Sequence, residues 1–267
     1  MTNTIKILYL GDIFGMPGRE VVREFLPSLI DKHDLDLVLA NCENAAQGRG
    51  ISERLVNELL GYGVDFMTSG NHIYHVDGVF PYLNKKDTKV LRPYNFSRNS
   101  PGRGVGVIET KNGIKVGVIN IMGRVFMEPS VDLPFDAVDE AILEIQGESD
   151  ILVLDMHAET TSEKRAMGWH LDGRVSLVVG THTHVQTADE EILPNGTGYI
   201  TDLGMCGPYE SVIGMAIGPV LKRFRMQISR RFEVAQNDAR LCGVICEIDT
   251  HTKKAVKIER VCERMAD

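Results

Sequence analysis

The sequence has few cysteines, no long apolar run and no signal for export. Its five cysteines are an odd number, and the close pair Cys242 and Cys246 has no second pair that would complete a zinc ribbon. This argues against a disulfide framework or a structural zinc site, and it favours free thiols in a reducing cytoplasm. No apolar stretch approaches the roughly 20 residues that span a bilayer, and Met1–Leu10 resembles a strand more than a signal peptide. We therefore expect a cytoplasmic protein with no membrane partner.

Basic residues are also in deficit. The chain has 29 Lys and Arg against 37 Asp and Glu, which gives a formal net charge of −8 over 267 residues. An acidic chain repels the nucleic-acid backbone, which argues against a duplex-DNA binder that works by bulk charge. Hydrophobic residues make up 43% of the chain, too many for an intrinsically disordered protein. The length suits one large domain with a well-buried core.

Short runs that are apolar on nearly every residue recur along the chain, as in strands covered on both faces. The clearest runs are Ile5–Leu10, Leu35–Ala40, Val116–Ile121, Ile151–Met156, Ser176–Val179 and Leu241–Ile248. Helical patterns lie between several of them. These are Gly18–Lys32, Ser52–Tyr62, Val138–Ile145, Thr160–Trp169 and Pro219–Ile228. The alternation of strands and helices predicts an α/β fold.

Two stretches depart from this alternation. Arg92–Gly106 is rich in Pro, Asn, Ser and Gly and predicts a long loop or lid. Arg240–Arg260 predicts a β-hairpin with its turn near Asp249–Lys253. No internal repeat or linker divides the chain. We therefore predict a single domain over residues 1–267, with a possible small lid or subregion around 80–135.

Side chains that can bind metals follow five of the apolar runs, at the point where each run ends. They are Asp12, Glu43 and Asn44, Asn71 and His72, His157, and His182 and His184. The carboxyl ends of strands in an α/β sheet meet at one edge, which is where ligands bind. Each residue taken alone has an ordinary explanation, such as a helix cap or a semi-buried histidine. Their common position predicts a shared site.

The chemistry of this set is coherent. Carboxylate, amide and imidazole groups without thiolates form a mixed oxygen and nitrogen environment, which favours Mn, Fe, Zn or similar ions. Six or seven ligands are too many for one tetrahedral ion. They suit two ions roughly 3.5–4 Å apart that share one carboxylate.

The ordered set resembles the motifs of the calcineurin-like metallophosphoesterases, and the longer stretches are most similar to the YmdB-like bacterial phosphodiesterases. Those stretches are 11–19 (GDIFGMPGR), 43–50 (ENAAQGRG), 180–189 (GTHTHVQTAD) and 197–205 (TGYITDLGM). The resemblance extends over most of the chain, to about Arg260. Any one motif alone is a weak signal, whereas their order along the chain is specific.

The resemblance implies a four-layer α/β/β/α sandwich with a dinuclear metal centre. Matching positions imply that the first metal is held by Asp12, Glu43, Asn44 and His184, and the second by Glu43, Asn71, His157 and His182. Glu43 would bridge the two ions, for which Fe or Mn is expected, with Zn as the alternative. The nucleophile would be a metal-bridging hydroxide. His72 matches the general acid that protonates the leaving-group oxygen.

Three departures from the wider superfamily bear on these assignments. The usual Asp-x-His is Asp12-Ile13-Phe14 here, so one imidazole is missing and Asn44 is the natural replacement. The usual bridging Asp is Glu43, whose longer side chain can still bridge. The Asp that orients the general acid is replaced by Ala46, which leaves open what positions His72.

These observations predict a metal-dependent phosphodiesterase for a small diester, a 2′,3′- or 3′,5′-cyclic nucleotide. A phosphomonoesterase of the same fold and a nucleotide-sensing regulatory protein with little turnover are the alternatives. RNA stays open as a substrate, although neither a basic stripe nor an aromatic RNA-binding motif supports it. Arg49, Arg92, Arg103 and Arg124 are candidate phosphate partners or solvated surface residues. Apolar residues without a core period in 80–105 and Val125–Pro134 favour a homo-oligomer.

Overall fold

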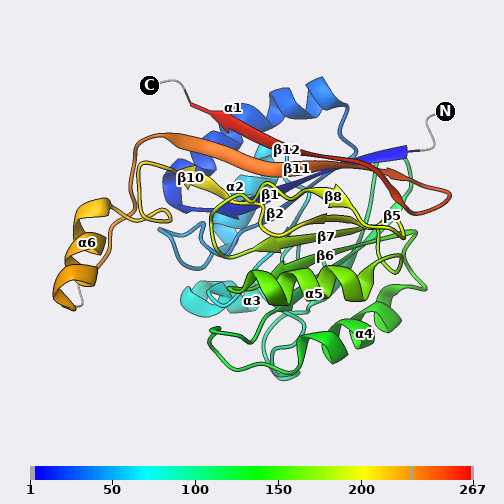
Figure 1. Ribbon diagram of the computed structural model, residues 1–267, viewed down its shortest axis with the longest axis horizontal. Coiled ribbons are helices and arrows are strands. Elements are labelled where there is room, and N and C mark those ends of the chain that lie inside the picture. Colours follow the sequence, from blue (N-terminus) through cyan, green and yellow to red (C-terminus); the bar gives the residue numbers. More distant parts are fainter. Residues whose placement is uncertain (1–3, 229–230, 266–267) are drawn as a thin grey trace.

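Two six-stranded sheets pack face to face in the computed structural model, which describes residues 4–228 and 231–265 (Figure 1). The first sheet has the order β12-β11-β10-β1-β2-β3. Its strands are β1 (Thr4–Ile13), β2 (Leu37–Asn41), β3 (Phe66–Thr68), β10 (Met205–Pro208), β11 (Ala239–Asp249) and β12 (Ala255–Arg264). Strands β10, β1, β2 and β3 are parallel, while β11 pairs antiparallel with β1, β10 and β12.

The second sheet has the order β4-β5-β6-β7-β9-β8. Its strands are β4 (Val105–Glu109), β5 (Lys115–Met122), β6 (Ile151–His157), β7 (Leu177–Thr181), β8 (Glu191–Ile192) and β9 (Gly198–Ile200). Strands β5, β6, β7 and β9 are parallel, and the edge strands β4 and β8 run antiparallel to their neighbours.

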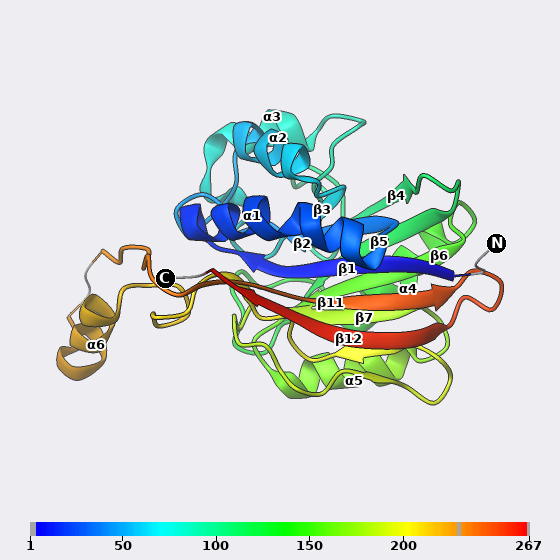
Figure 2. The same ribbon diagram turned by 90° about the horizontal axis from the view of Figure 1, so that it is seen from above.

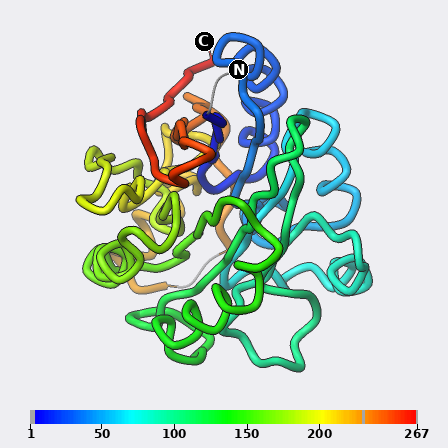
Figure 3. Tube along the Cα trace, turned by 90° about the vertical axis from the view of Figure 1, so that its right-hand side faces the viewer, coloured from blue at the N-terminus to red at the C-terminus, as the bar shows by residue number. Residues whose placement is uncertain are grey.

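Helices cover the outer faces of both sheets (Figures 2 and 3). The α-helices of the described residues are α1 (Gly15–His33), α2 (Glu53–Tyr62), α3 (Phe80–Leu83), α4 (Pro134–Ile145), α5 (Thr161–Leu171) and α6 (Ile217–Met226). Helices α1 and α2 pack on the first sheet, and α4 and α5 pack on the second. Helix α6 is different, because it projects from the body of the molecule (Figures 1 and 2).

The alternation of side chains along each strand produces the layers. Ile7 and Tyr9 of β1 lie between the sheets, whereas Leu8 and Leu10 pack against the helices. In the second sheet, Val118 lies between the sheets and Ile119 packs under α4 and α5. Every one of these side chains is buried, since both faces of each sheet are covered. The predicted four-layer α/β/β/α sandwich is confirmed.

The six predicted strands and five predicted helices are all present, with shifted bounds. Helix α1 begins at Gly15 and continues past Pro27. Ser52 is the N-cap of α2, and its side chain makes no capping hydrogen bond. The C-terminal hairpin of β11 and β12 is confirmed.

The loop predicted over Arg92–Gly106 is irregular as far as residue 104, where β4 follows. Residues 105–122, inside the subregion around 80–135, form β4, β5 and their turn in the second sheet. The single-domain assignment stays a prediction. Among the described residues, no helix is both long and apolar enough to cross a membrane.

Candidate metal centre

The carboxyl ends of the parallel strands bring the predicted site residues to one edge of the sandwich. Asp12 is the penultimate residue of β1 and His157 is the last residue of β6. Glu43 follows β2 by two residues, and His182 directly follows β7. Glu43 and His157 come from different sheets, yet Glu43 Oε1 lies 3.1 Å from His157 Nε2.

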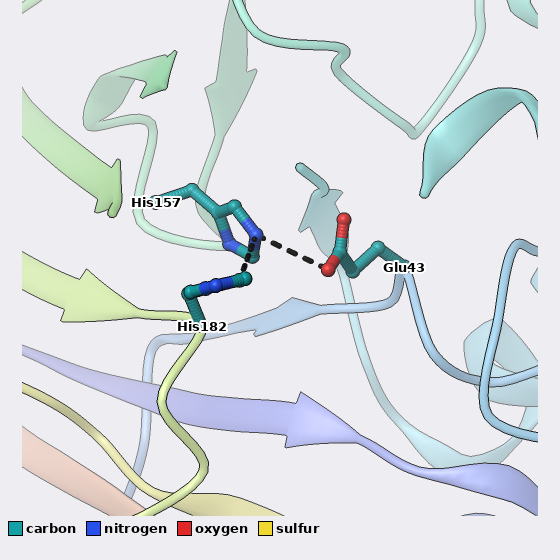
Figure 4. A group of neighbouring side chains, drawn as sticks. All are labelled: Glu43, His157 and His182. Carbon is teal, nitrogen blue, oxygen red and sulfur yellow. Dashed lines mark hydrogen bonds and ion pairs between the residues drawn. The ribbon is translucent and has the colours of Figure 1, made fainter. Parts of the chain in front are cut away.

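Three groups that can donate a lone pair lie around His157 Nε2, which can itself donate one. His182 Nδ1 lies 3.1 Å from this nitrogen, Asn71 Oδ1 lies 3.2 Å from it, and Glu43 Oε1 lies at 3.1 Å. Figure 4 shows the side chains of Glu43, His157 and His182 pointing toward one another. Ligand atoms of these three residues all lie within 4.8 Å of one another, which is compact enough to surround one ion. The four residues are those predicted for the second metal.

A buried hydrogen-bond chain fixes the orientation and tautomer of His157. The Thr181 hydroxyl donates to Asp155 Oδ1 at 2.6 Å, so its oxygen is free to accept from His157 Nδ1–H at 2.9 Å. With the hydrogen on Nδ1, the lone pair of Nε2 faces the cluster. Asp155 is fully buried and also accepts from Asn41 Nδ2 and the Thr68 hydroxyl. This carboxylate therefore orients His157, a candidate ligand, through the Thr181 hydroxyl.

Three buried oxygens at this edge have no hydrogen-bond partner. They are Asp12 Oδ1, Glu43 Oε1 and Asn44 Oδ1. A buried oxygen without a partner is costly, because its hydration is lost and nothing replaces it. Three such hard oxygens beside three imidazoles match the ligands of divalent Mn, Fe or Zn. The donor set therefore fits metal ions.

Asp12 and His184 form the other side of the site. His184 Nε2 lies 3.8 Å from Asp12 Oδ1, while its Nδ1 donates to the carbonyl oxygen of Ile213 at 3.0 Å. The lone pair of Nε2 is thereby directed toward Asp12. The second oxygen of Asp12 accepts from the backbone N–H of His182 at 3.1 Å, which joins the two halves of the site.

Burial and mutual charge shift the pKa values of the cluster strongly. Burial raises the pKa of Asp12 to about 6 and lowers that of His182 to about 2. Burial also acts to lower the pKa of His157, but Glu43 outweighs it and raises that pKa to about 9. Burial acts to raise the pKa of Glu43, which His157 and His72 nevertheless hold well below its usual range. Positive charge is favoured between Glu43 and His157, as a bound cation would provide.

His72 lies beside the cluster and is positioned by Asn44 and Glu43. The Asn44 amide donates to Gly48 O at 2.9 Å, which places its Nδ2 3.2 Å from His72 Nδ1. An amide nitrogen can only donate, so His72 Nδ1 accepts and Nε2 carries the hydrogen. The His72 backbone N–H donates to Glu43 Oε2 at 2.9 Å. Burial lowers the pKa of His72 to about 4, despite the opposing effect of Glu43.

The segment that carries His182 and His184 has a strained backbone. Both residues have positive φ, 100° for His182 and 65° for His184, which costs about 1–3 kcal/mol each in a residue with a Cβ. Thr183 between them is held by Asp202, whose Oδ2 accepts from the Thr183 backbone N–H at 3.1 Å and hydroxyl at 2.8 Å. The same oxygen accepts from the buried Lys164 ammonium at 2.6 Å. This ion pair anchors the loop that presents two imidazoles.

The segment around Glu43 is anchored from helix α1. Arg19 donates to Ala45 O at 2.6 Å, and Gly15 N–H donates to Asn44 O at 2.9 Å. On the opposite side of the cluster, a Cβ on Gly70 would lie 2.1 Å from the His157 ring. Glycine is therefore required before Asn71 for the two ligands to approach.

All eight predicted site residues lie at this edge, and their roles stay predictions. Sequence reasoning missed the residues that hold them, namely Asp155, Lys164, Thr181 and Asp202. Asp155 could have been found, because it is an acidic residue inside the apolar run of β6. Nothing in the sequence singles out Lys164 in α5. Glu159 was missed too, and its Oε2 lies 3.1 Å from His182 Nε2.

Comparisons with known proteins agree over nearly the whole chain. A family model described as YmdB-like protein matches residues 8–261. The 2′,3′-cyclic-nucleotide 2′-phosphodiesterase of Bacillus subtilis is 46% identical over 257 residues, which cover 96% of each chain. A crystal structure of a novel phosphatase from Mycoplasma pneumoniae superimposes with a TM-score of 0.92 at 37% identity, covering 99% of this chain and 95% of that one. A hypothetical protein from Thermus thermophilus gives a TM-score of 0.91 at 37% identity over 98% and 100% of the two chains.

Proposed function

Because this chain belongs to the YmdB-like family and is a phosphoesterase, we propose that it hydrolyses 2′,3′-cyclic nucleotides at the P–O2′ bond. A water oxygen bonds to phosphorus, the P–O2′ bond breaks, and the released O2′ takes up a proton. The product is a 3′-phosphomonoester. The observation that carries this proposal is the group of three unpartnered buried oxygens beside three imidazoles.

The proposed ligands are those expected from the motifs. The first ion would be held by Asp12, Glu43, Asn44 and His184, and the second by Glu43, Asn71, His157 and His182. Fe or Mn suits these oxygen and nitrogen donors, with Zn as the alternative. When bound, the ions supply Lewis-acid charge for the phosphate oxygens and an activated water as the nucleophile.

The protein side chains contribute orientation and a proton donor. Thr181 and Ile213 direct the imidazoles of His157 and His184, so no reorganisation is needed when substrate arrives. Because Nδ1 accepts from Asn44, His72 presents Nε2–H to the leaving oxygen as a hydrogen-bond donor. Transfer of the proton itself, as the general acid, requires the imidazolium form of His72. In the wider superfamily an Asp orients the general acid, and Ala46 stands at that position here. We propose that Asn44 orients His72 instead, through its hydrogen bond to Nδ1.

Two further assignments belong to this proposal. Free thiols support a cytoplasmic location, since Cys42, Cys206, Cys242, Cys246 and Cys262 are all unpaired. A homo-oligomer is supported by helix α6, on which Ile217, Leu221 and Phe224 form an exposed apolar stripe.

The test compares hydrolysis of 2′,3′-cyclic AMP, bis-p-nitrophenyl phosphate and p-nitrophenyl phosphate, with Mn²⁺ and with a chelator. We expect chelator-sensitive cleavage of the diesters that is lost in Asn71→Ala. Asn57→Ala is the matched control, because Asn57 is an exposed residue of α2. A preference for the monoester would establish the phosphatase alternative, and bound nucleotide without turnover would establish the sensor.

A further inference from the structure

Arg49 and two arginines from a distant part of the chain, Arg223 and Arg231, line one groove beside the metal centre. They share it with one acidic residue, Glu233, and with the apolar side chains of Met16, Met215 and Phe232, around a cavity of about 860 Å³. We call it the arginine groove. Among the described residues, none of its three arginines forms an ion pair with a carboxylate. The guanidinium of Arg223 instead lies 5.4 Å from the centre of the Phe232 ring.

The arginine groove is continuous with the site through residues that contact both. The Phe14 ring packs edge-on against His184, with ring centres 5.3 Å apart. A Cβ on Gly48 would lie within 3.2 Å of the Phe14 ring and of Met215, so these groups form one wall. Arg49 directly follows Gly48, whose carbonyl oxygen accepts from the same Asn44 amide that lies 3.2 Å from His72 Nδ1. A substrate held at His72 therefore has these cations within reach of its remaining parts.

The charge of this region opposes that of the molecule. Residues 217–231 contain Lys222, Arg223, Arg225, Arg230 and Arg231 and no acidic residue, whereas the chain as a whole has a net charge of −8. Unpaired guanidinium groups in an acidic protein are expected to have an anionic partner. Arg223 lies on a different face of α6 from the apolar stripe of Ile217, Leu221 and Phe224.

The reaction class that makes 2′,3′-cyclic phosphates indicates which anion the arginine groove would bind. When RNA is cut by its own 2′-hydroxyl, an O2′–P bond forms, the P–O5′ bond breaks and the proton passes to O5′. The cyclic phosphate then ends an RNA chain, with further phosphates on its 5′ side. In such a chain, the cyclic phosphate would lie at the metal centre and the phosphates on its 5′ side would lie at the arginines. The Phe232 ring would offer a surface on which a base can stack.

Building on the proposed function, we propose that the arginine groove binds the backbone phosphates of single-stranded RNA that ends in a 2′,3′-cyclic phosphate. Oligoribonucleotide ends are then the preferred substrates over cyclic mononucleotides. The basic stretch at 222–231 is visible in the sequence, but only the fold brings Arg223 and Arg231 into one groove with Arg49.

The test uses a triple variant, Arg49→Gln with Arg223→Gln and Arg231→Gln, and Arg98→Gln as the control on an 89% exposed side chain elsewhere. Binding of a fluorescent single-stranded oligoribonucleotide with a 3′-phosphate end is followed by anisotropy in chelator. We expect the triple variant to bind at least about tenfold more weakly. The dependence of log Kd on log salt should flatten by about 2, at about 0.7 per lost phosphate contact.

A parallel assay compares kcat/KM for the cyclic-ended oligoribonucleotide with that for 2′,3′-cyclic AMP. The preference for the oligoribonucleotide should fall in the triple variant and persist in Arg98→Gln. Equal RNA affinity and equal salt dependence in wild type and triple variant would overturn the proposal. A change of mass in light scattering with unchanged RNA affinity would also overturn it, and would assign these arginines to contact with a second copy. If wild type hydrolyses neither substrate, the proposed function is rejected. The anisotropy measurement would still test whether the arginine groove binds RNA.

Discussion

At the scale of single residues, hydrogen bonds decide which nitrogen of each histidine carries a lone pair into the site. Thr181 directs His157, the Ile213 carbonyl directs His184, and the Asn44 amide directs His72. The first two arrangements turn a lone pair toward the carboxylates, as a metal ligand requires. The third does the opposite and turns an N–H outward, as a hydrogen-bond donor to a leaving oxygen requires. The proposed ligands and the proposed acid thus differ in their hydrogen-bond partners, although all are histidines that follow strands.

The Thr181→Val variant tests this distinction for a ligand. The change removes one hydroxyl, which leaves His157 Nδ1–H without its acceptor and takes from Asp155 the donor to its Oδ1. We expect Mn²⁺ affinity to fall about 10–100-fold and the apoprotein to lose about 1–3 kcal/mol of stability. The control is Thr88→Val, which removes a buried hydroxyl outside the cluster. It should lower stability and leave the Mn²⁺ affinity unchanged. Isothermal titration that gives the same Mn²⁺ affinity in both variants would refute this role of Thr181.

The His72→Ala variant tests the proposed role of His72 as the general acid. We expect kcat for the diester to fall about 10²–10⁴-fold while metal content stays normal, since His72 presents N–H and no lone pair. His251→Ala, on an exposed turn, is the control. Metal analysis that finds ions missing from the His72 variant would show that this residue is a ligand.

At the scale of elements, the strained loop after β7 depends on a helix from which it is separated in sequence. Lys164 of α5 neutralises Asp202, and Asp202 holds Thr183 by two hydrogen bonds. Both charged side chains are buried, at 1% and 0% exposure, so neither can be rescued by water. The backbone strain at His182 and His184 is offset by this anchor.

Lys164→Met should therefore cost about 3–5 kcal/mol, because it leaves the Asp202 carboxylate buried without a counter-charge. Adding Asp202→Asn should cost less than the sum of the single changes, since the pair is coupled. Chemical denaturation of the chelated protein measures stability, and Mn²⁺ titration should show weakened affinity in Lys164→Met. Additive free energies would contradict the coupling, and unchanged affinity would show that the ion pair does not position the histidines.

The elements also show how far sequence reasoning extends. Strands β1, β2, β5, β6, β7 and β11 are predictable because they are apolar on nearly every residue. Strands β8, β9 and β10 have two to four residues each, too few for a period. Strand β10 also pairs with β1, which is far away in the chain. The candidate ligands could be found because each ends a strand. Asp202 could not, because nothing in the sequence shows that its carboxylate contacts Thr183 and Lys164.

At the scale of the whole molecule, the two sheets bring their carboxyl ends to the same edge, so each ligand set draws on both. Asp12, Glu43, Asn44 and Asn71 come from the first sheet, and His157, His182 and His184 come from the second. Ions at this position would join the halves of the sandwich, which makes metal binding a contribution to folding as well as to catalysis. An overall negative charge is compatible with an anionic substrate, because two bound divalent ions, as proposed, would dominate the local field together with the arginine groove.

The most direct test is a titration of Mn²⁺ into the chelated enzyme, with bound metal and 2′,3′-cyclic AMP hydrolysis measured on the same samples. We predict that wild type binds two ions per chain and that hydrolysis reaches its plateau only with the second. Asn71→Ala should bind one ion tightly and remain inactive, while Asn57→Ala should match wild type. Full hydrolysis with one ion per chain, or hydrolysis that persists without metal, would contradict a dinuclear phosphodiesterase.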